Sequence, residues 1–263
     1  MELKINVIDA FTDATFKGNP AAVIITENWL SVELMQSIAV ENNLSETAFV
    51  KKIDSQHYEI RWFSPITEIE FCGHATLAAS FVIFAKSNHL KSIDFFAKAV
   101  GNLSVTEMDN GYIQMSFPNR QPKVVDDIPL ALLNGLSIKP VEVLLNDQAY
   151  FVVYEQEADV KNVMPDIELL KQLAPFDIVV TAKSSEYDFI SRYFWPANGG
   201  YEDPVTGSIH SGLAPYWASK LNKSELIAYQ ASKRGGKLIC SIKGNKVYIS
   251  GKAVQYLEGK ITV

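Results

Sequence analysis

Residues that can move a proton or bind an anion gather around two glycines of this chain. His74 follows Gly73 in "CGHATLA", and Ser208 follows Gly207 in "TGSIHSGLA"; Asp203 lies four residues before the second glycine. Both stretches predict the start of a helix, where free N–H groups and a partial positive charge favour anions. Glycine there lets a ligand approach the backbone closely. If the two helix starts face each other, they suit a carboxylate or another small anion.

A further acid/base candidate is Glu46, in "NNLSETAFV", at a predicted helix-to-strand boundary among apolar residues. Partial desolvation favours the protonated carboxyl and suits a general acid/base. Each candidate also has a structural interpretation. Glu46 can be a loop acid, and His74 a core histidine satisfied by the backbone. Asp203 before a proline is a common turn residue, and Ser208 a common helix-start residue.

Other site classes have little support in the sequence. The four histidines and two cysteines show no metal-ligand spacing, and no C-x-x-C pattern occurs. Cys72 is typical of a small buried hydrophobic residue. Neither a phosphate-binding glycine loop nor a nucleophile motif is present. We therefore expect no metal and no cofactor.

Composition narrows the class of protein and its partners. The chain has 263 residues, of which 48% are hydrophobic and 21% charged, so it can bury a substantial core. A net charge of −6 without long blocks of one sign argues against nucleic acid as a partner. Two cysteines indicate a reducing compartment, the first residues do not resemble a signal peptide, and no apolar run is long enough for a bilayer. We expect a cytoplasmic protein with no membrane partner.

The chain contains one internal repeat. The pattern Arg, aromatic, Phe, any residue, Pro occurs at 61–65 and again at 192–196, and each copy predicts a strand that ends at its proline. A short acidic linker, an apolar helix and a hairpin follow each copy. The hairpins are expected to turn at Asn110-Gly111, as a type I′ turn, and at Gly244-Asn245. The arginines lie 131 residues apart and the glycines of the helix starts 134 apart, which indicates a duplicated unit.

The repeat predicts two domains, over 1–117 and 118–263, with a last strand that can cross back to the first. Each half has one helix that is apolar nearly all round, so we expect a curled sheet wrapped around a central helix. A more amphipathic helix over 30–43 is expected on the outside, with Ser31 as its N-cap. The polar, proline-rich segment 118–127 is the expected crossover between the halves.

Five segments together resemble the phenazine-biosynthesis PhzF-like family and cover nearly the whole chain. They are "FKGNPAAVI", "NNLSETAFV", "FSPITEIEFCGHATLAA", "RYFWPANGGYEDPVTGSIHSGLAPYW" and "ASKRGGKL". The resemblance implies an α+β, diaminopimelate-epimerase-like fold of two pseudo-symmetric domains, each a curled sheet or barrel around a central helix, with the active site in the cleft between them. It also implies a cofactor-free and metal-free isomerase, usually a homodimer. The characterised type moves a proton on trans-2,3-dihydro-3-hydroxyanthranilate.

The resemblance also implies roles for individual residues. Glu46 corresponds to the proton-shuttling acid/base, and His74 and Asp203 correspond to catalytic polar groups around the amine and hydroxyl of the substrate. The substrate-binding residues that it implies are Gly73, Gly207, Ser208 and Asn19.

The related epimerases use two cysteines, one on each face of the substrate. Cys72 matches one of them, but Thr206 stands at the place of the other and has no accessible thiolate. We therefore expect a Glu-based isomerase acting on a small carboxylate-bearing cyclic or amino-acid-like compound. Two alternatives stay open: an epimerase or racemase of a small amino or hydroxy acid, and a small-anion-binding protein without turnover.

Overall fold

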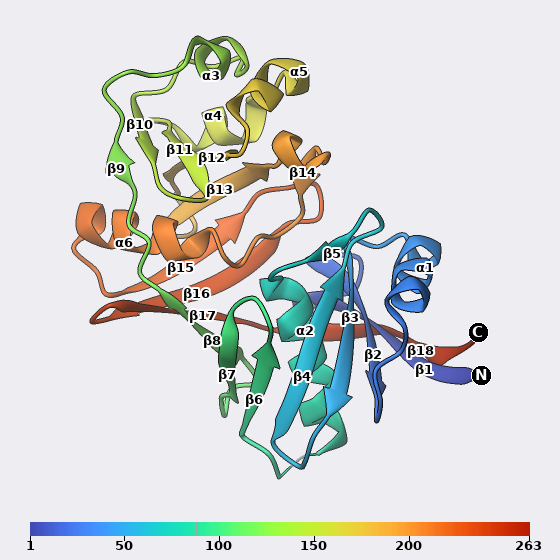
Figure 1. The fold of residues 1–263 in the computed structure, drawn as a ribbon. Helices are drawn as coiled ribbons and strands as arrows, with labels where there is room; N and C mark the ends of the chain where they lie inside the picture. The colour runs from blue at the N-terminus through green and yellow to red at the C-terminus, as the bar shows by residue number, and fades with distance from the viewer. Residues whose placement is uncertain (88) are drawn as a thin grey trace. The chain divides into compact units, whose positions relative to one another are not determined.

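The computed structural model describes residues 1–87 and 89–263, and the chain divides into two compact units (Figure 1). The first unit consists of Met1–Ser116 together with Ser250–Val263, and the second of Phe117–Ile249. The sequence placed one boundary between 117 and 118; the structure divides the chain after Ser116 and again after Ile249. Each unit is described by itself below.

The first unit is a curled sheet whose strands pair in the order β18, β1, β2, β3, β4, β6, β7, β8. Its strands are β1 (Glu2–Ala10), β2 (Asn19–Thr26), β3 (Glu46–Lys52), β4 (His57–Phe63), β5 (Glu68–Ile69), β6 (Ser92–Ala97), β7 (Gly101–Glu107), β8 (Ile113–Pro118) and β18 (Ala253–Thr262). The short strand β5 adds to β4. The pairs β2–β3 and β4–β6 are parallel, and the others are antiparallel.

Two helices accompany this sheet. Helix α2 (Gly73–Lys86) is the central helix: it contacts β1, β2, β3 and β18, and nearly all of its residues are buried (Figure 1). Helix α1 (Val32–Asn42) contacts β3 and β4 and buries one face. Its N-cap is Ser31, whose Oγ accepts a hydrogen bond from the Leu34 N–H at 3.2 Å. The predictions of a central buried helix, an amphipathic helix and its cap are confirmed.

The second unit has a sheet of the same kind, in the order β9, β10, β11, β12, β13, β15, β16. Its strands are β9 (Lys123–Val124), β10 (Glu142–Leu145), β11 (Ala149–Val153), β12 (Asp177–Lys183), β13 (Phe189–Phe194), β14 (Glu202–Asp203), β15 (Glu225–Gln230), β16 (Gly236–Lys243) and β17 (Lys246–Gly251). Its helices are α3 (Leu130–Asn134), α4 (Glu157–Asn162), α5 (Ile167–Leu170) and α6 (His210–Leu221), with 3₁₀ turns at Lys171–Leu173 and Pro196–Asn198. Helix α6 contacts β15 and β16, and α4 contacts β12 and β13.

Strand pairing confirms the internal repeat. The succession antiparallel, parallel, antiparallel, parallel, antiparallel joins β1, β2, β3, β4, β6 and β7, and the same succession joins β10, β11, β12, β13, β15 and β16. One ion pair is also repeated. Arg61 donates two hydrogen bonds to the carboxylate of Glu68, from Nε at 2.7 Å and from Nη2 at 2.6 Å. Arg192 does the same to Glu202, at 2.7 and 3.0 Å. The repeat therefore extends from topology to individual side chains.

Helix α6 begins three residues later than the sequence predicted. Residues 207–209 form a turn with i→i+3 hydrogen bonds, and the helix begins at His210 rather than at Gly207. Pro215 inside the helix has no N–H to donate to the carbonyl of Ser211, and the Arg120 N–H donates to that carbonyl instead, at 3.1 Å. The Gly207 stretch is therefore a tight turn that leads into a helix.

The prediction of a type I′ turn at Asn110-Gly111 is wrong, although the hairpin is present. A type I′ turn needs a positive φ at both central residues. Only Gly111 has one, at +76°, and the Met108 N–H donates to the carbonyl of Tyr112, so the loop is longer than two residues. The hairpin itself, β7 with β8, is present.

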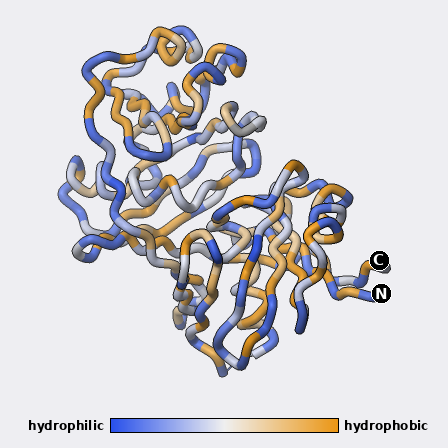
Figure 2. The backbone as a smooth tube through the Cα atoms, viewed as in Figure 1, coloured by the Kyte–Doolittle hydropathy of each residue, from blue (hydrophilic) through white to orange (hydrophobic). Residues whose placement is uncertain are grey.

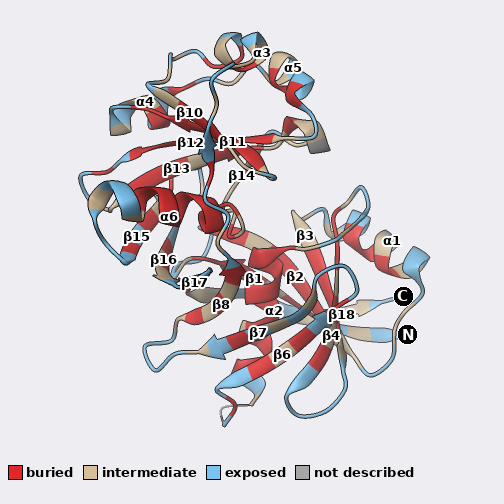
Figure 3. Cartoon of the chain, turned by 60° about the vertical axis from the view of Figure 1, so that its left-hand side comes forward, coloured by how far each residue is buried: buried red, intermediate tan, exposed pale blue. Residues whose placement is uncertain are grey.

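Hydrophobic residues follow the strands and the central helices, as the orange stretches of the tube show (Figure 2). The same stretches are buried, and the loops are exposed (Figure 3). In the described part of the chain, no helix combines the length and the apolar character that crossing a membrane requires.

Candidate active site

Four polar side chains of the first unit meet at the starts of three of its elements. Asn19 is the first residue of β2, and Glu46 is the first residue of β3. Because β2 and β3 are parallel neighbours, both strands begin at the same end of the sheet. Cys72 is the N-cap of α2 and His74 its second residue, so the buried start of this helix presents both side chains. The fold thus brings together residues that the sequence separates by up to 55 positions.

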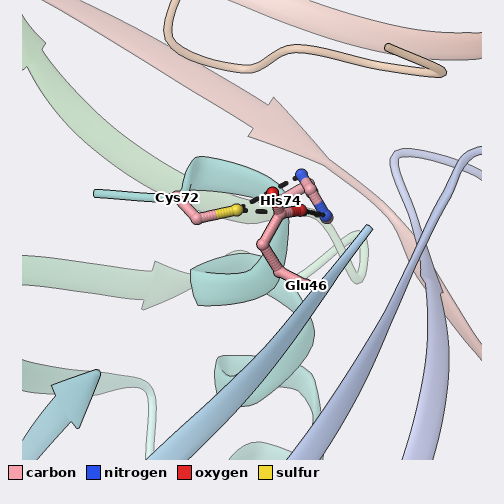
Figure 4. A group of neighbouring side chains, drawn as sticks. All are labelled: Glu46, Cys72 and His74. Carbon is pink, nitrogen blue, oxygen red and sulfur yellow. Dashed lines mark hydrogen bonds and ion pairs between the residues drawn. The ribbon is translucent and has the colours of Figure 1, made fainter. Parts of the chain in front are cut away.

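His74 is the centre of this group (Figure 4). Its Nε2 lies 2.9 Å from Oε2 of Glu46, and its Nδ1 lies 3.1 Å from Nδ2 of Asn19. The sulfur of Cys72 lies 3.4 Å from Nδ1 and 3.9 Å from Nε2. The side chains of His74 and Glu46 are only 6% and 13% exposed. A carboxylate and an imidazole thus lie at ion-pair distance in a nearly closed, weakly screening environment.

The surroundings of His74 favour its charged form. Burial opposes an imidazolium, but the neighbouring carboxylate of Glu46 raises the pKa of His74 above its ordinary value. The amide of Asn19 can serve either form, because Nδ2 donates to a neutral Nδ1 and, after an amide flip, Oδ1 accepts from a protonated one. The site therefore tolerates the arrival and departure of a proton.

Cys72 remains a thiol at neutral pH. Burial, and then the charge of Glu46, raise the pKa of this thiol to about 11. Its role in the group is therefore that of a polarisable neighbour of His74, rather than that of a thiolate base.

Glu46, Cys72 and His74 also offer ligand atoms that lie within 4.8 Å of one another, a spacing that a metal ion can bridge. Sequence spacing did not indicate this group, because Glu46 comes from a different element. Metal binding requires a deprotonated sulfur and a free imidazole nitrogen. Here the sulfur holds its proton, and Nε2 is in direct contact with Glu46. A metal ion would have to displace both this proton and the contact with Glu46.

The remaining predicted residues, Asp203, Gly207 and Ser208, lie in the second unit. Oδ2 of Asp203 accepts a hydrogen bond from the Thr206 hydroxyl at 2.5 Å. Gln230 fixes this turn, because its Oε1 accepts from the Thr206 N–H and its Nε2 donates to the Asp203 carbonyl, both at 2.8 Å. The predicted residues thus form two groups, each rigidly held within its own unit.

Three further residues near Ser208 were not predicted from the sequence. Gln148 contacts Ser208 directly, Tyr193 contacts Gln148, and Asp177 contacts Tyr193. The repeat held a signal for two of them. Asp177 lies 131 residues after Glu46, the offset that separates Arg61 from Arg192, and Tyr193 lies beside Arg192 itself.

Known proteins share this fold and this sequence. Residues 8–259 match the family described as phenazine biosynthesis-like proteins, PhzC-PhzF. An uncharacterised isomerase of Pseudomonas aeruginosa is 45% identical, with 99% of each chain covered. A PhzF-family crystal structure from Enterococcus faecalis is 42% identical, with a TM-score of 0.95 and 100% of each chain covered. A hydroxyproline epimerase of Agrobacterium vitis shares the fold alone, at 9% identity, with a TM-score of 0.66 and coverage of 99% of this chain and 92% of that one.

The family and its curated relatives support an isomerase-type activity. Within this class, the chain belongs to the phenazine biosynthesis-like family, as the resemblance in its sequence predicted. The α+β fold of this family is confirmed.

Proposed function

We propose that this protein is a cofactor-independent isomerase that moves a proton on a small carboxylate-bearing cyclic or amino-acid-like substrate, with Glu46 as the only general acid/base. The observation that carries the proposal is the contact of 2.9 Å between Glu46 and His74 in a nearly closed site. A carboxylate that must take a proton from carbon needs an ionised form that is stabilised but not solvated. A buried imidazolium supplies that stabilisation without water.

The steps follow from the neighbours of Glu46. The carboxylate takes a proton from one carbon of the substrate, the carboxyl that results exchanges this acidic proton with solvent, and it then gives a proton to a second carbon. His74 stabilises the anion before the transfer, and Asn19 holds the imidazole in place through Nδ1. Cys72 does not compete as a base, because its pKa of about 11 keeps it protonated.

The second unit supports chemistry with a single base. Thr206 stands where a two-thiol racemase needs its other cysteine, and the Thr206 hydroxyl donates to Asp203. We assign Asp203 to the amine or hydroxyl of the substrate, and Ser208 and Gly207 to its carboxylate. In the first unit, Gly73 at the start of α2 is assigned to the substrate as well.

The test uses trans-2,3-dihydro-3-hydroxyanthranilate in D₂O, followed by NMR. The proposal predicts deuterium at a new carbon, and a loss of at least about 1,000-fold in rate for Glu46→Gln, because removal of the only acid/base removes the transfer itself. Glu46→Asp keeps the carboxyl and should retain part of the activity. Glu70→Gln, which neutralises an exposed carboxylate of the same unit, is the matched control and should leave the rate unchanged.

Three results would contradict the proposal. Full turnover by Glu46→Gln excludes Glu46 as the acid/base. Deuterium only at the original stereocentre favours an epimerase. Stabilisation of the protein by the compound, with no exchange of solvent protons into it, favours a binding protein without turnover.

A further inference from the structure

The second unit contains a chain of hydrogen bonds that begins at a buried carboxylate and ends at the partly buried Ser208. The hydroxyl of Tyr193 donates to Oδ2 of Asp177 at 2.7 Å. Nε2 of Gln148 donates to Oη of Tyr193 at 3.2 Å and to Oγ of Ser208 at 3.0 Å. Tyr193 is 4% exposed and Asp177 9% exposed. The chain thus joins a buried carboxylate to the hydroxyl of Ser208 through two intermediate side chains.

The direction of every hydrogen bond in this chain is fixed by its buried end. A carboxylate only accepts, so the Tyr193 proton is committed to Asp177, and the Tyr193 oxygen must accept from its other neighbour. Burial, and then the charge of Asp177, raise the pKa of Tyr193 well above its ordinary value, so this proton is retained. The amide of Gln148 must therefore present Nε2, rather than its oxygen, to both hydroxyls.

This direction determines what Ser208 can offer a ligand. Its oxygen accepts from Gln148, so the proton of the hydroxyl points away from Gln148 and can be donated to a ligand. Within the described residues, no hydrogen bond uses that proton. A hydroxyl held in this way is matched to an acceptor, and best to an anion, because hydrogen bonds to charged groups are the stronger ones.

The chain occupies the place in the second unit that the acid/base group occupies in the first. Asp177 pairs opposite Ala149 on a parallel neighbour, just as Glu46 pairs opposite Ala21. Ser208 follows its glycine as His74 does. Equivalent positions thus carry a proton-transfer group in one copy of the repeat and a fixed hydrogen-bond donor in the other.

We propose that Gln148, Tyr193 and Asp177 are positioning residues that fix the Ser208 hydroxyl as a donor to the carboxylate of the substrate and thereby select against uncharged analogues. The inference rests on the proposed function in one respect, namely that Ser208 contacts the substrate. A carboxamide presents an uncharged oxygen and N–H groups, so a hydroxyl whose proton is directed outward binds it more weakly than it binds a carboxylate.

The experiment measures the binding of anthranilate and of 2-aminobenzamide to the full chain by calorimetry. The wild type should prefer anthranilate by at least about 10-fold, a preference of the size expected for one charge-assisted hydrogen bond. Tyr193→Phe should weaken anthranilate binding by about 5- to 10-fold and leave 2-aminobenzamide nearly unchanged. Gln148→Glu places acceptors against both hydroxyls, turns the Ser208 proton inward, and should abolish the preference.

Tyr154→Phe is the matched control, because the hydroxyl of this buried tyrosine of the same unit donates to the Ile138 carbonyl and not to the chain at Ser208. It should bind both compounds as the wild type does. Melting temperatures measured for every variant separate a loss of the fold from a loss of the preference.

A double-mutant cycle separates a positioning role from a structural one. If Tyr193 acts through Ser208, Tyr193→Phe should have no effect on anthranilate binding in a Ser208→Ala background. An equal effect in both backgrounds overturns the proposal, as does a wild type that binds neither compound or both equally. Failure of the proposed function looks different, because Glu46→Gln should keep the preference for anthranilate whether or not it abolishes turnover.

Discussion

His210 gives a pH dependence of stability that can be calculated from the structure. It is the first residue of α6 and is fully buried. Its Nδ1–H donates to the Thr206 carbonyl at 2.9 Å, while Nε2 has no partner among the described residues. Burial lowers the pKa of His210 to about 4, from an ordinary value of 6.5, although the bond to Thr206 acts the other way. The folded protein therefore keeps this imidazole neutral where the unfolded chain protonates it.

The direction of the effect follows from proton linkage. Above about pH 6.5 neither state binds the proton, so His210 has no effect on the free energy of unfolding. As the pH falls from 6.5 to 4, the unfolded state binds more protons than the folded one, and stability decreases. With 1.36 kcal/mol for each unit of pKa difference, the loss reaches about 2.5 kcal/mol between pH 7.5 and pH 4.5.

The measurement is urea unfolding at both pH values for the wild type and for His210→Thr. Threonine occupies the equivalent position of the first unit, where the Thr76 hydroxyl donates to the Cys72 carbonyl at 2.6 Å, so the variant preserves that type of hydrogen bond. The variant is expected to be less stable at pH 7.5 but to lose about 2.5 kcal/mol less than the wild type on acidification. His89→Gln, at an exposed position, controls for the loss of a histidine. Equal losses in the wild type and in His210→Thr would refute the reasoning.

Two pairs of residues, the first of them related by the repeat, supply two further predictions that urea unfolding checks. Arg192→Gln should lower the free energy of unfolding by about 3 kcal/mol, because its ion pair is largely buried and Nη1 also donates to backbone carbonyls. Arg61→Gln, whose ion pair is more exposed, should lower it by about 1 kcal/mol or less. Equal losses would contradict the role of burial. Gly18→Ala should cost at least about 3 kcal/mol, because φ is +63° and the added Cβ lies 2.1 Å from the Ala10 carbonyl oxygen. Gly101→Ala, at φ +77° with no atom within 4 Å, should cost about 1 kcal/mol, and a cost as large as that of Gly18→Ala would show that backbone strain alone is responsible.

The features that depend on pattern were predictable from the sequence. The repeat spacing of Arg61 and Arg192 predicted two similar units, because each copy must build the same strand, linker and helix. The meeting of His74 with Glu46 followed only from family resemblance. Sequence spacing alone does not show that the start of the strand with Glu46 and the start of the helix with His74 lie at the same end of the sheet.

Other features depended on tertiary structure. The carbonyl of Ser211, which Pro215 leaves without a helical partner, accepts from the Arg120 N–H, and Arg120 lies far away in the sequence. The chain from Asp177 to Ser208 depends on side-chain orientations that no local pattern encodes. The repeat nevertheless indicated two of its members, because Asp177 lies 131 residues after Glu46 and Tyr193 lies beside Arg192.

The return of the last strand to the first unit affects the order in which the protein can fold during its synthesis. Strand β18 pairs with β1 along its length, and α2 packs against it. Residues 250–263 are translated after Phe117–Ile249, so the first unit lacks an essential strand until the second has been synthesised. Until these residues are available, the first unit, which contains Glu46 and His74, exposes an edge of β1. The acid/base site thus belongs to the unit that begins first and is completed last.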